Sequence, residues 1–512
     1  MESEIFVAIA EDGTKEVNVR AERLNLRLLA AQVLNYIPGS ILPAFFNLIS
    51  AAIFTRVFSA LEYGQYSLVM SVITSIVAIS SQWLQQAINR YLPAVTNEKE
   101  RRWIKQVTAV GFVLTCLFLV GVSIPTWALV VITLPSQWQR FILPAILFVV
   151  AMSAFNSVSV VLQAEMQARR FSYFSLANTA GKLVLSIVIV FTINREPAGM
   201  VWGAALSTIL LLPILWYRAD MPALKTLRRE EWPNYWADIK RLATYGFPMI
   251  GWFLAATLLN VGDRYVIQWF RGSTEVGIYS ANYSLINGAA GLVAAPVLLA
   301  AHPFLMRAWG EGDKINAGKW LGTIAEWILQ AGIVLIGATC LFSSDIATWF
   351  LGVEFRSGHI VMPIVIAGVV TWQLGMYAHK PLEFSERTKL MFILSLAVAV
   401  LNLVLNIIFV PKFGYLAAAY TTLVSFIVYT ITTSVVGQRF LQWRVNFRSV
   451  GVTILATAIT VVSLTKLRQL FEHTWGYAPG FLITLVCYTV TVIIVLRLVG
   501  LDFRKLFIQL RC

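Results

Sequence analysis

Runs of about twenty apolar residues recur along this sequence, and they restrict its fold more than any other feature. An α-helix rises about 1.5 Å per residue, so roughly twenty helical residues span the ~30 Å hydrocarbon core of a bilayer. Charged residues make up only 13% of the chain, which is about half of their share in a typical soluble domain. The sequence therefore predicts an all-α polytopic membrane protein.

The apolar runs predict about fourteen transmembrane helices. In membrane proteins, Lys and Arg gather in the cytoplasmic connections. With the N-terminus inside, the inner segments carry 30 of the 40 Lys and Arg residues and the outer connections carry 9. We therefore expect a multi-pass protein with both termini in the cytoplasm. The expected helices are centred on residues 34–54, 67–88, 107–131, 141–163, 173–193, 198–217, 245–266, 277–301, 320–342, 359–379, 390–410, 414–436, 449–466 and 480–499.

The remaining charge pattern excludes other classes of protein. The first 30 residues mix acidic and basic side chains with few apolar runs, which indicates a cytoplasmic leader and no cleavable signal peptide. The net charge of +14 follows mostly from the membrane orientation. Nucleic-acid binding is not expected, because no basic stripe with interleaved aromatic residues lies on a soluble face. None of the four cysteines has metal-ligand spacing, so no metal site is expected.

A six-residue motif occurs twice, each time at the start of an apolar run. Residues 62–67 read Glu-Tyr-Gly-Gln-Tyr-Ser, and residues 275–280, which lie 213 positions later, read Glu-Val-Gly-Ile-Tyr-Ser. The repeated offset indicates that the chain consists of two homologous halves. The same offset aligns Phe171-Ser172 with Phe384-Ser385, and it aligns Ala204-Ala205 and Thr208 with Ala417-Ala418 and Thr421.

The two halves predict the architecture. Each contains six expected helices and begins inside, so they should form two six-helix bundles related by a pseudo-two-fold axis along the membrane normal, with a cleft between them. Pro38 and Pro248 occupy similar places in the first and seventh helices, where proline permits a bend. The expected division is a cytoplasmic leader (1–30), an N-terminal bundle (31–217), a cytoplasmic linker (218–242), a C-terminal bundle (243–437), and two extra helices with a cytoplasmic tail (438–512).

Several motifs carry a resemblance to a known family. Thr55-Arg56, residues 62–67 and residues 87–93 (Ala-Ile-Asn-Arg-Tyr-Leu-Pro) resemble the opening of bacterial polysaccharide transporters. In the second half, Gly262-Asp263-Arg264, residues 276–280, Pro303 and residues 413–419 (Phe-Gly-Tyr-Leu-Ala-Ala-Ala) repeat the likeness. The family comprises the O-antigen and exopolysaccharide flippases of the multidrug/oligosaccharidyl-lipid/polysaccharide superfamily, and the likeness covers roughly residues 30–440.

The resemblance implies a function. It implies that a polyprenyl-diphosphate-linked oligosaccharide is moved from the cytoplasmic to the outer leaflet of the plasma (inner) membrane. The partners implied are this lipid-linked oligosaccharide, membrane lipids, and the polymerase and glycosyltransferases of cell-surface polysaccharide biosynthesis.

A diphosphate that crosses a low-dielectric region needs fixed positive charge in place of water. Lys182 is the foremost candidate, because it lies about eight residues into the fifth expected helix. Arg90, Arg264 and Arg56 are further candidates, since they lie at the ends of helices expected to line the cleft. The alternatives are an ion pair or snorkelling for Lys182 and interfacial anchoring for the arginines.

An acid or a histidine that changes protonation could couple transport to H⁺ or Na⁺. Glu326, Asp263 and His302 are the candidates for this ion coupling. The structural alternatives are an ion pair with a neighbour for Asp263 and a polar helix end for His302. Glu62 and Glu275 come directly at the start of helices, where a carboxylate favours the N-terminus, so we expect structural roles for them.

Two other functions compete with the flippase. A cation-coupled multidrug antiporter of the same superfamily would share the fold. A membrane glycosyltransferase or polymerase would usually place catalytic groups on a large outer loop, whereas the longest expected outer connection, residues 343–358, has about 16 residues. The sequence contains no nucleotide-binding loop or catalytic triad. We therefore expect a transporter without a cofactor, and not an enzyme.

Overall fold

The computed structural model describes residues 42–498 except 94, 96, 134, 224–230 and 311, and all regular elements in this part are helical. The expected leader, Pro38 and the tail beyond residue 498 lie outside it. An unlabelled helix, Leu42–Val57, comes first. The labelled helices are α2 (Ala60–Tyr91), α3 (Glu98–Thr133), α4 (Ser136–Ala164), α5 (Ala168–Thr192), α6 (Ala198–Arg218), α7 (Trp232–Arg271), α8 (Ser273–Gly310), α9 (Lys314–Phe350), η3 (Val353–Val361), α10 (Met362–Ala378), α11 (Lys380–Phe384), α12 (Thr388–Gly437), α13 (Phe447–Trp475) and α14 (Tyr477–Leu498).

Helices lie at all of the fourteen expected positions that the described residues cover. In this part of the chain, ten helices are long and apolar enough to cross a membrane, or eleven if the bent α7 is one span. Leu42–Val57 is a shorter apolar helix. The long α12 contains two expected spans, because Gly414 breaks it with non-helical angles (φ 61°, ψ −150°). The prediction of an all-α polytopic membrane protein is therefore confirmed.

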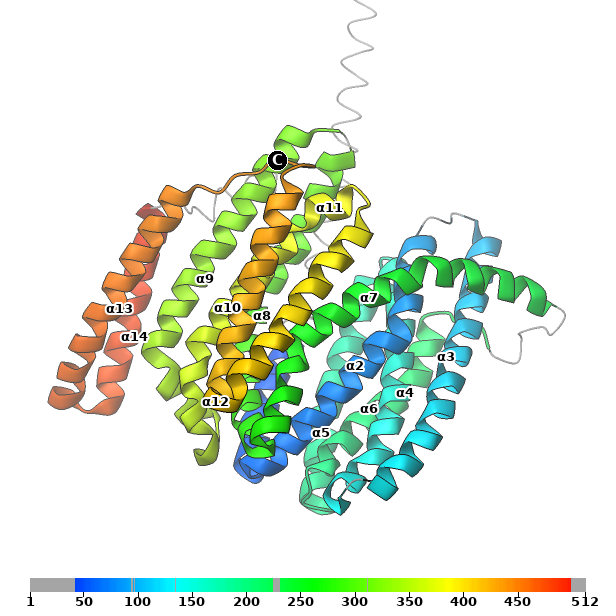
Figure 1. The fold of residues 1–512 in the computed structure, drawn as a ribbon, viewed down its shortest axis with the longest axis horizontal. Coiled ribbons are helices and arrows are strands. Elements are labelled where there is room, and N and C mark those ends of the chain that lie inside the picture. Colours follow the sequence, from blue (N-terminus) through cyan, green and yellow to red (C-terminus); the bar gives the residue numbers. More distant parts are fainter. Residues whose placement is uncertain are drawn as a thin grey trace, which may run out of the picture.

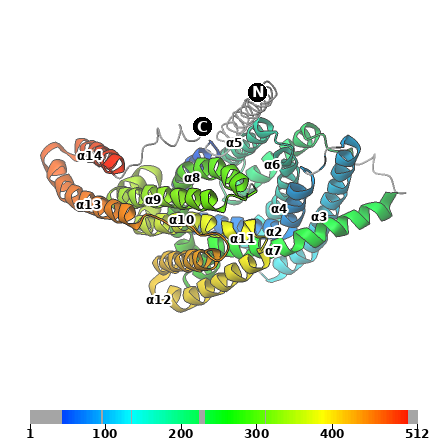
Figure 2. The same ribbon diagram turned by 90° about the horizontal axis from the view of Figure 1, so that it is seen from above.

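The helices form two groups with a pair of helices at one edge (Figure 1). Helices α2 to α6 gather on one side, and α8 to α12 gather on the other. Both α13 and α14 pack against α9, on the side of the second group that faces away from the first (Figure 2). This is the expected arrangement of two bundles followed by two additional helices.

The long helix α7 belongs to both bundles. Its segment Trp232–Phe247, which we term the arm, is bent by 44° from the segment Ile250–Arg271. Tyr235, Ile239 and Leu242 of the arm are buried in a core cluster with residues of α2, α3 and α4. The arm therefore packs with the first bundle as far as the bend, where Pro248 lies in the sequence.

Two of the three sequence anchors of the repeat lie at equivalent places in the two bundles. Residues 62–67 and 275–280 fall in the first two turns of α2 and α8. The buried pairs Ala204-Ala205 and Ala417-Ala418 lie in the sixth helix of each half.

The third anchor was wrong. Phe171-Ser172 lies within α5, after the turn at Met166, whereas Phe384 ends α11, before the corresponding turn at Glu386. Met166 and Glu386 mark these turns with left-handed backbone angles of φ 55° and 56°. The turn at Met166 and the turn at Glu386 are 220 positions apart, whereas the anchor used an offset of 213. A fixed sequence offset therefore pairs positions on opposite sides of the two turns.

Candidate functional site

Arg264 lies where the two bundles meet. Its side chain, on α7, is buried, and only 7% of the residue is exposed. Nε donates to Oγ of Ser280 in α8 at 3.0 Å, and Nη1 donates to Oγ of Ser71 in α2 at 3.4 Å. The guanidinium carbon lies 5.3 Å from the ring centroid of Tyr283. No carboxylate of the described residues forms an ion pair with Arg264, so neutral hydroxyl groups and a ring hold this buried cation.

Asp263 is buried beside Arg264, with 1% of the residue exposed. Its Oδ1 accepts the backbone N–H of Arg264 at 2.8 Å, and its Oδ2 accepts the hydroxyl of Tyr279. The expected alternative, an ion pair with the neighbouring guanidinium, is not the contact that Asp263 makes. One buried carboxyl group and one buried guanidinium group thus occupy adjacent positions of α7, and each is bonded to neutral donors or acceptors.

Hydroxyl and aromatic groups extend the polar cluster around Arg264. Tyr265 and Ser75 are joined by a hydroxyl–hydroxyl hydrogen bond of 3.1 Å between α7 and α2. The rings of Tyr63 and Tyr66 in α2 lie 5.8 Å apart. Sequence reasoning did not select these tyrosines and serines, although Tyr279 and Ser280 belong to the repeated motif. Such groups can bind the hydroxyl groups and ring faces of sugars as well as an anion.

Lys182 contacts an aromatic ring of the N-terminal bundle. Its Nζ is 5.0 Å from the centroid of the Phe148 ring, which belongs to α4. Phe148 is fully buried, whereas Lys182 on α5 is half-buried. In the part of the chain that the structure describes, Lys182 forms no ion pair. The pairing with an acid that we considered as the structural alternative is therefore not found there.

Arg90 lies at the far end of α2 from the Arg264 cluster. It is nineteen positions beyond Ser71, which corresponds to about 28 Å along a helix. Its guanidinium carbon is 4.5 Å from the ring centroid of Tyr245 in the arm, and that of Arg241 is 5.2 Å from the ring centroid of Tyr91. Arg90 is exposed. These two cation–π contacts hold the end of α2 to the arm.

Arg56 contacts the end of a helix in the second bundle. Its guanidinium donates to the carbonyl oxygens of Ala52 at 2.6 Å and Phe350 at 3.1 Å, and also to that of Trp349. The last carbonyls of α9 have no partner within their own helix, and the helix dipole favours a cation there. This contact assigns Arg56 a structural role at the C-terminus of α9.

Glu326 also contacts a helix end. Its Oε2 accepts the backbone N–H of Asn446 at 3.4 Å, and its Oε1 accepts from the side chain of Gln330 at 3.3 Å. Asn446 is the N-cap residue of α13, so the carboxylate lies at the positive end of that helix. Glu326 therefore makes its contacts outside the Arg264 cluster, and it supports the packing of α13 against α9.

The other acids and the histidine complete the set of candidates. Glu62 forms a capping box with Ser59 at the start of α2, as expected for an acid in a first turn. Glu275 accepts the backbone N–H of Tyr415 at 3.0 Å and so supports the second part of α12. His302 lies in α8, and its side chain is outside those that the structure describes. No group of three or more His, Cys, Asp or Glu side chains in the described part could hold a metal ion.

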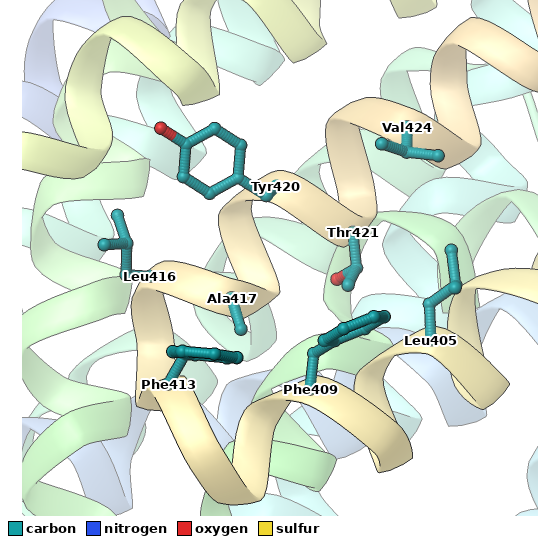
Figure 3. Close-up of a pocket in the computed structure, with 8 residues that line it drawn as sticks. All are labelled: Leu405, Phe409, Phe413, Leu416, Ala417, Tyr420, Thr421 and Val424. Atoms are coloured by element: carbon teal, nitrogen blue, oxygen red, sulfur yellow. The ribbon is translucent and has the colours of Figure 1, made fainter.

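An apolar groove lies on the second bundle, between the two parts of α12 (Figure 3). Its volume is about 350 Å³. The hydroxyl of Thr421 is used within the protein, because it donates to Oδ1 of Asn406 at 2.7 Å. The groove therefore offers an apolar surface suited to a hydrocarbon chain. Its lining residues are Leu405, Phe409, Phe413, Leu416, Ala417, Tyr420, Thr421 and Val424.

Solved structures with the same fold are membrane transport proteins. The lipid II flippase MurJ in an inward closed conformation superposes with a TM-score of 0.71 at 13% identity, over 90% of this chain and 98% of that one. An inward-facing multidrug MATE transporter of the MOP superfamily gives 0.57 at 16% identity, over 80% and 94%. A MATE transporter of Vibrio cholerae gives 0.57 at 14% identity, over 82% and 98%. The fold thus defines a multi-span helical membrane protein of the two-bundle architecture of MurJ and MATE proteins.

The family follows from the sequence of the first bundle and the beginning of the second. Residues 29–309, which are more than half of the chain, match the family described as polysaccharide biosynthesis protein. The chain belongs to this family. None of the curated proteins matches it.

Proposed function

We propose that this protein is a flippase that carries a polyprenyl-diphosphate-linked oligosaccharide from the cytoplasmic to the outer leaflet of the plasma membrane. Its family supports a role in polysaccharide biosynthesis, and its fold supports transport. In this proposal the protein catalyses no reaction itself. Glycosyltransferases build its substrate on the cytoplasmic side, and a polymerase uses the product outside.

The observation that carries the proposal is the environment of Arg264. A buried cation without a paired carboxylate is costly, because its desolvation is not offset by an opposite charge in direct contact. Ser71 of the first bundle and Ser280 of the second hold the guanidinium at their junction. A diphosphate that reaches this junction would supply the missing anion through charge-assisted hydrogen bonds.

Lys182 supplies a second positive charge in this mechanism. Its ammonium group has only an aromatic face as a contact in the described structure, so it is available to a phosphate. Arg90, exposed at the end of α2 that we assign to the cytoplasm, would meet the headgroup first. The diphosphate then passes from one fixed cation to the next.

The membrane orientation of the proposal follows the distribution of Lys and Arg. Both termini and the arm of α7 face the cytoplasm, and the end where α2 and α8 begin faces outside. Transport is coupled to an H⁺ or Na⁺ gradient through Asp263. This carboxylate is buried next to Arg264, so its charge state directly alters the charge balance around the guanidinium group that would bind the substrate.

The test uses purified protein in vesicles that contain a polyprenyl-diphosphate-linked oligosaccharide. We expect Arg264→Ala to slow flipping by roughly 10- to 100-fold, which is the loss of about 1.5–3 kcal/mol of charged hydrogen bonding. Arg264→Lys keeps the charge and should retain part of the rate. The matched control is Arg271→Ala, because Arg271 is an exposed arginine of the same helix that pairs with Glu275. Full flipping by a folded Arg264→Ala protein would refute the role of Arg264, and no flipping by the wild type would refute the proposed function.

The buried Asp263 favours a second candidate, a cation-coupled multidrug antiporter. A buried carboxylate at the junction of the bundles could bind a cationic drug or a proton. The same vesicles can be tested for the export of a cationic dye. Dye export that is lost in Asp263→Asn, together with no flipping of the lipid-linked oligosaccharide, would establish the antiporter in place of the flippase.

A further inference from the structure

The arm of α7 carries a row of exposed aromatic side chains. Trp232, Trp236 and Phe247 are 47%, 57% and 58% exposed, and Lys240 is exposed between them. At 100° per helical residue, these four positions fall within a sector of about 80°. They therefore form one stripe, which we term the aromatic stripe.

A neighbouring face of the arm, roughly 100° round the helix from the stripe, is fixed to the protein. Tyr235, Ile239 and Leu242 are buried in the first bundle. The rings of Tyr235 and Trp103 stack at 4.7 Å, and Nε1 of Trp103 donates to Asp238 at 2.7 Å. The arm thus has a defined orientation. Trp232, Trp236 and Lys240 of the aromatic stripe lie on its free flank, whereas the ring of Phe247 stacks on Trp83 of α2 at 5.7 Å.

The position of the arm identifies the surroundings of this stripe. The arm continues through the 44° bend into the segment Ile250–Arg271, which we assign as a membrane span. The arm crosses the first bundle near one end (Figure 1), so we place its free flank at the level of the lipid headgroups. Indole rings prefer this level of a bilayer, and a lysine beside them reaches the lipid phosphates.

The charge of the arm matches an anionic membrane surface. Lys240 and Arg241 are exposed, whereas Asp238, the acidic residue of the arm, is turned to Trp103. A cation near an anionic leaflet favours binding to the membrane surface. We propose that the aromatic stripe with Lys240 is a docking surface for the headgroups of anionic phospholipids and anchors the first bundle to the bilayer surface. This inference does not depend on the proposed substrate.

The test compares two exposed positions on different flanks of the arm. Nitroxide labels are placed at Trp236→Cys and, as the matched control, at Asn234→Cys, in full-length protein whose four cysteines are replaced by serine. The protein is reconstituted in phosphatidylcholine vesicles with and without phosphatidylglycerol. Collision rates with oxygen, which concentrates in lipid, and with a water-soluble nickel complex report the surroundings of each label.

We expect the label at position 236 to favour oxygen and the label at position 234 to favour nickel. Phosphatidylglycerol should increase the contrast, and Lys240→Gln should abolish this increase. Equal access of nickel to both labels would overturn the docking surface. A contrast that is unaffected by phosphatidylglycerol and by Lys240→Gln would overturn the preference for anionic lipid.

Discussion

Gly64 in α2 and Gly277 in α8 each pack against the backbone of the other helix. A Cβ atom at Gly64 would overlap the carbonyl oxygen of Ser273, and one at Gly277 would overlap that of Ala60. The two glycines occupy the same place in the repeated motif. The motif therefore contacts its own copy across the junction of the bundles, and a hydrogen atom is the largest side chain that either position admits.

The contact between Gly64 and Gly277 predicts the effect of an added methyl group near the starts of α2 and α8. Gly64→Ala forces α2 and α8 apart, so the closed arrangement of this end should be lost and flipping should fall. A cysteine in place of the buried Ala281 should then react with an impermeant thiol reagent added outside. The control is Gly451→Ala, because nothing lies within 4 Å of the added atom there. Unchanged flipping and no labelling in the Gly64→Ala protein would contradict this role.

The membrane orientation predicts which connections can be labelled in intact cells. Asn234 of the arm and Ser357 of η3 are both exposed. Cysteine at position 357 should react with an impermeant reagent, and cysteine at position 234 should react only after the membrane is opened. Reaction at position 234 in intact cells would reject the orientation with both termini inside.

Lys182 should affect transport and leave folding intact. Because no ion pair of the described residues depends on it, Lys182→Ala should be at least as stable as the wild type and yet flip poorly. Lys182→Arg keeps the charge and should retain part of the activity. Thermal unfolding and flipping are measured on the same samples. An alanine variant that flips at the wild-type rate would remove Lys182 from the substrate path.

The two buried or half-buried acids of the second half should differ in their effect on coupling. Asp263→Asn should abolish the acceleration of flipping by an imposed H⁺ or Na⁺ gradient. Glu326→Gln should preserve it, because Glu326 contacts the N-terminus of α13 instead of the Arg264 cluster. The ratio of the rates with and without the gradient is the measurement. A loss of gradient dependence in Glu326→Gln alone would reverse the assignment.

The last two helices should depend on a buried ion pair. Nη1 and Nη2 of Arg468 in α13 each donate to Asp345 of α9 at 2.7 Å. Asp345 is 2% exposed. Asp345→Ala removes this buried partner but leaves Arg468 its ion pair with Glu472 at 2.7 Å, so it should cost about 1.5–3 kcal/mol, as for a hydrogen bond to a charged group. Thermal unfolding in detergent measures the loss, and the exposed Lys466→Ala is the control. Recovery of stability in the apolar pair Asp345→Leu with Arg468→Met would agree with an electrostatic origin.

The helices and the repeated halves could be predicted from the sequence, whereas most of the site could not. Hydropathy is a local property, so each apolar run identified its helix, and the break at Gly414 lay between two predicted runs. The bond between Ser71 and Arg264 joins residues 193 positions apart and depends on how α2 packs on α7. No single-helix pattern contains that information.

Glu326 illustrates the limit most clearly. Its depth along one helix suggested a functional charge, because counting residues from the helix end takes no account of neighbouring helices. In the fold, the N-terminus of α13 lies against Glu326 and gives the carboxylate a backbone donor. Arg468 was not selected from the sequence for a related reason, since its partner Asp345 lies on another helix.

Because of the bend in α7, the conformation of the protein can be followed by one distance between the two segments of this helix. One segment of this helix is fixed to the first bundle and the other packs against α12 of the second. A rotation in which the second segment moves with α12 should therefore change the 44° angle between the two segments. Spectroscopic labels at exposed Thr244 and exposed Leu258 would report the distance between the two segments during the transport cycle. Neither label would lie in the substrate path.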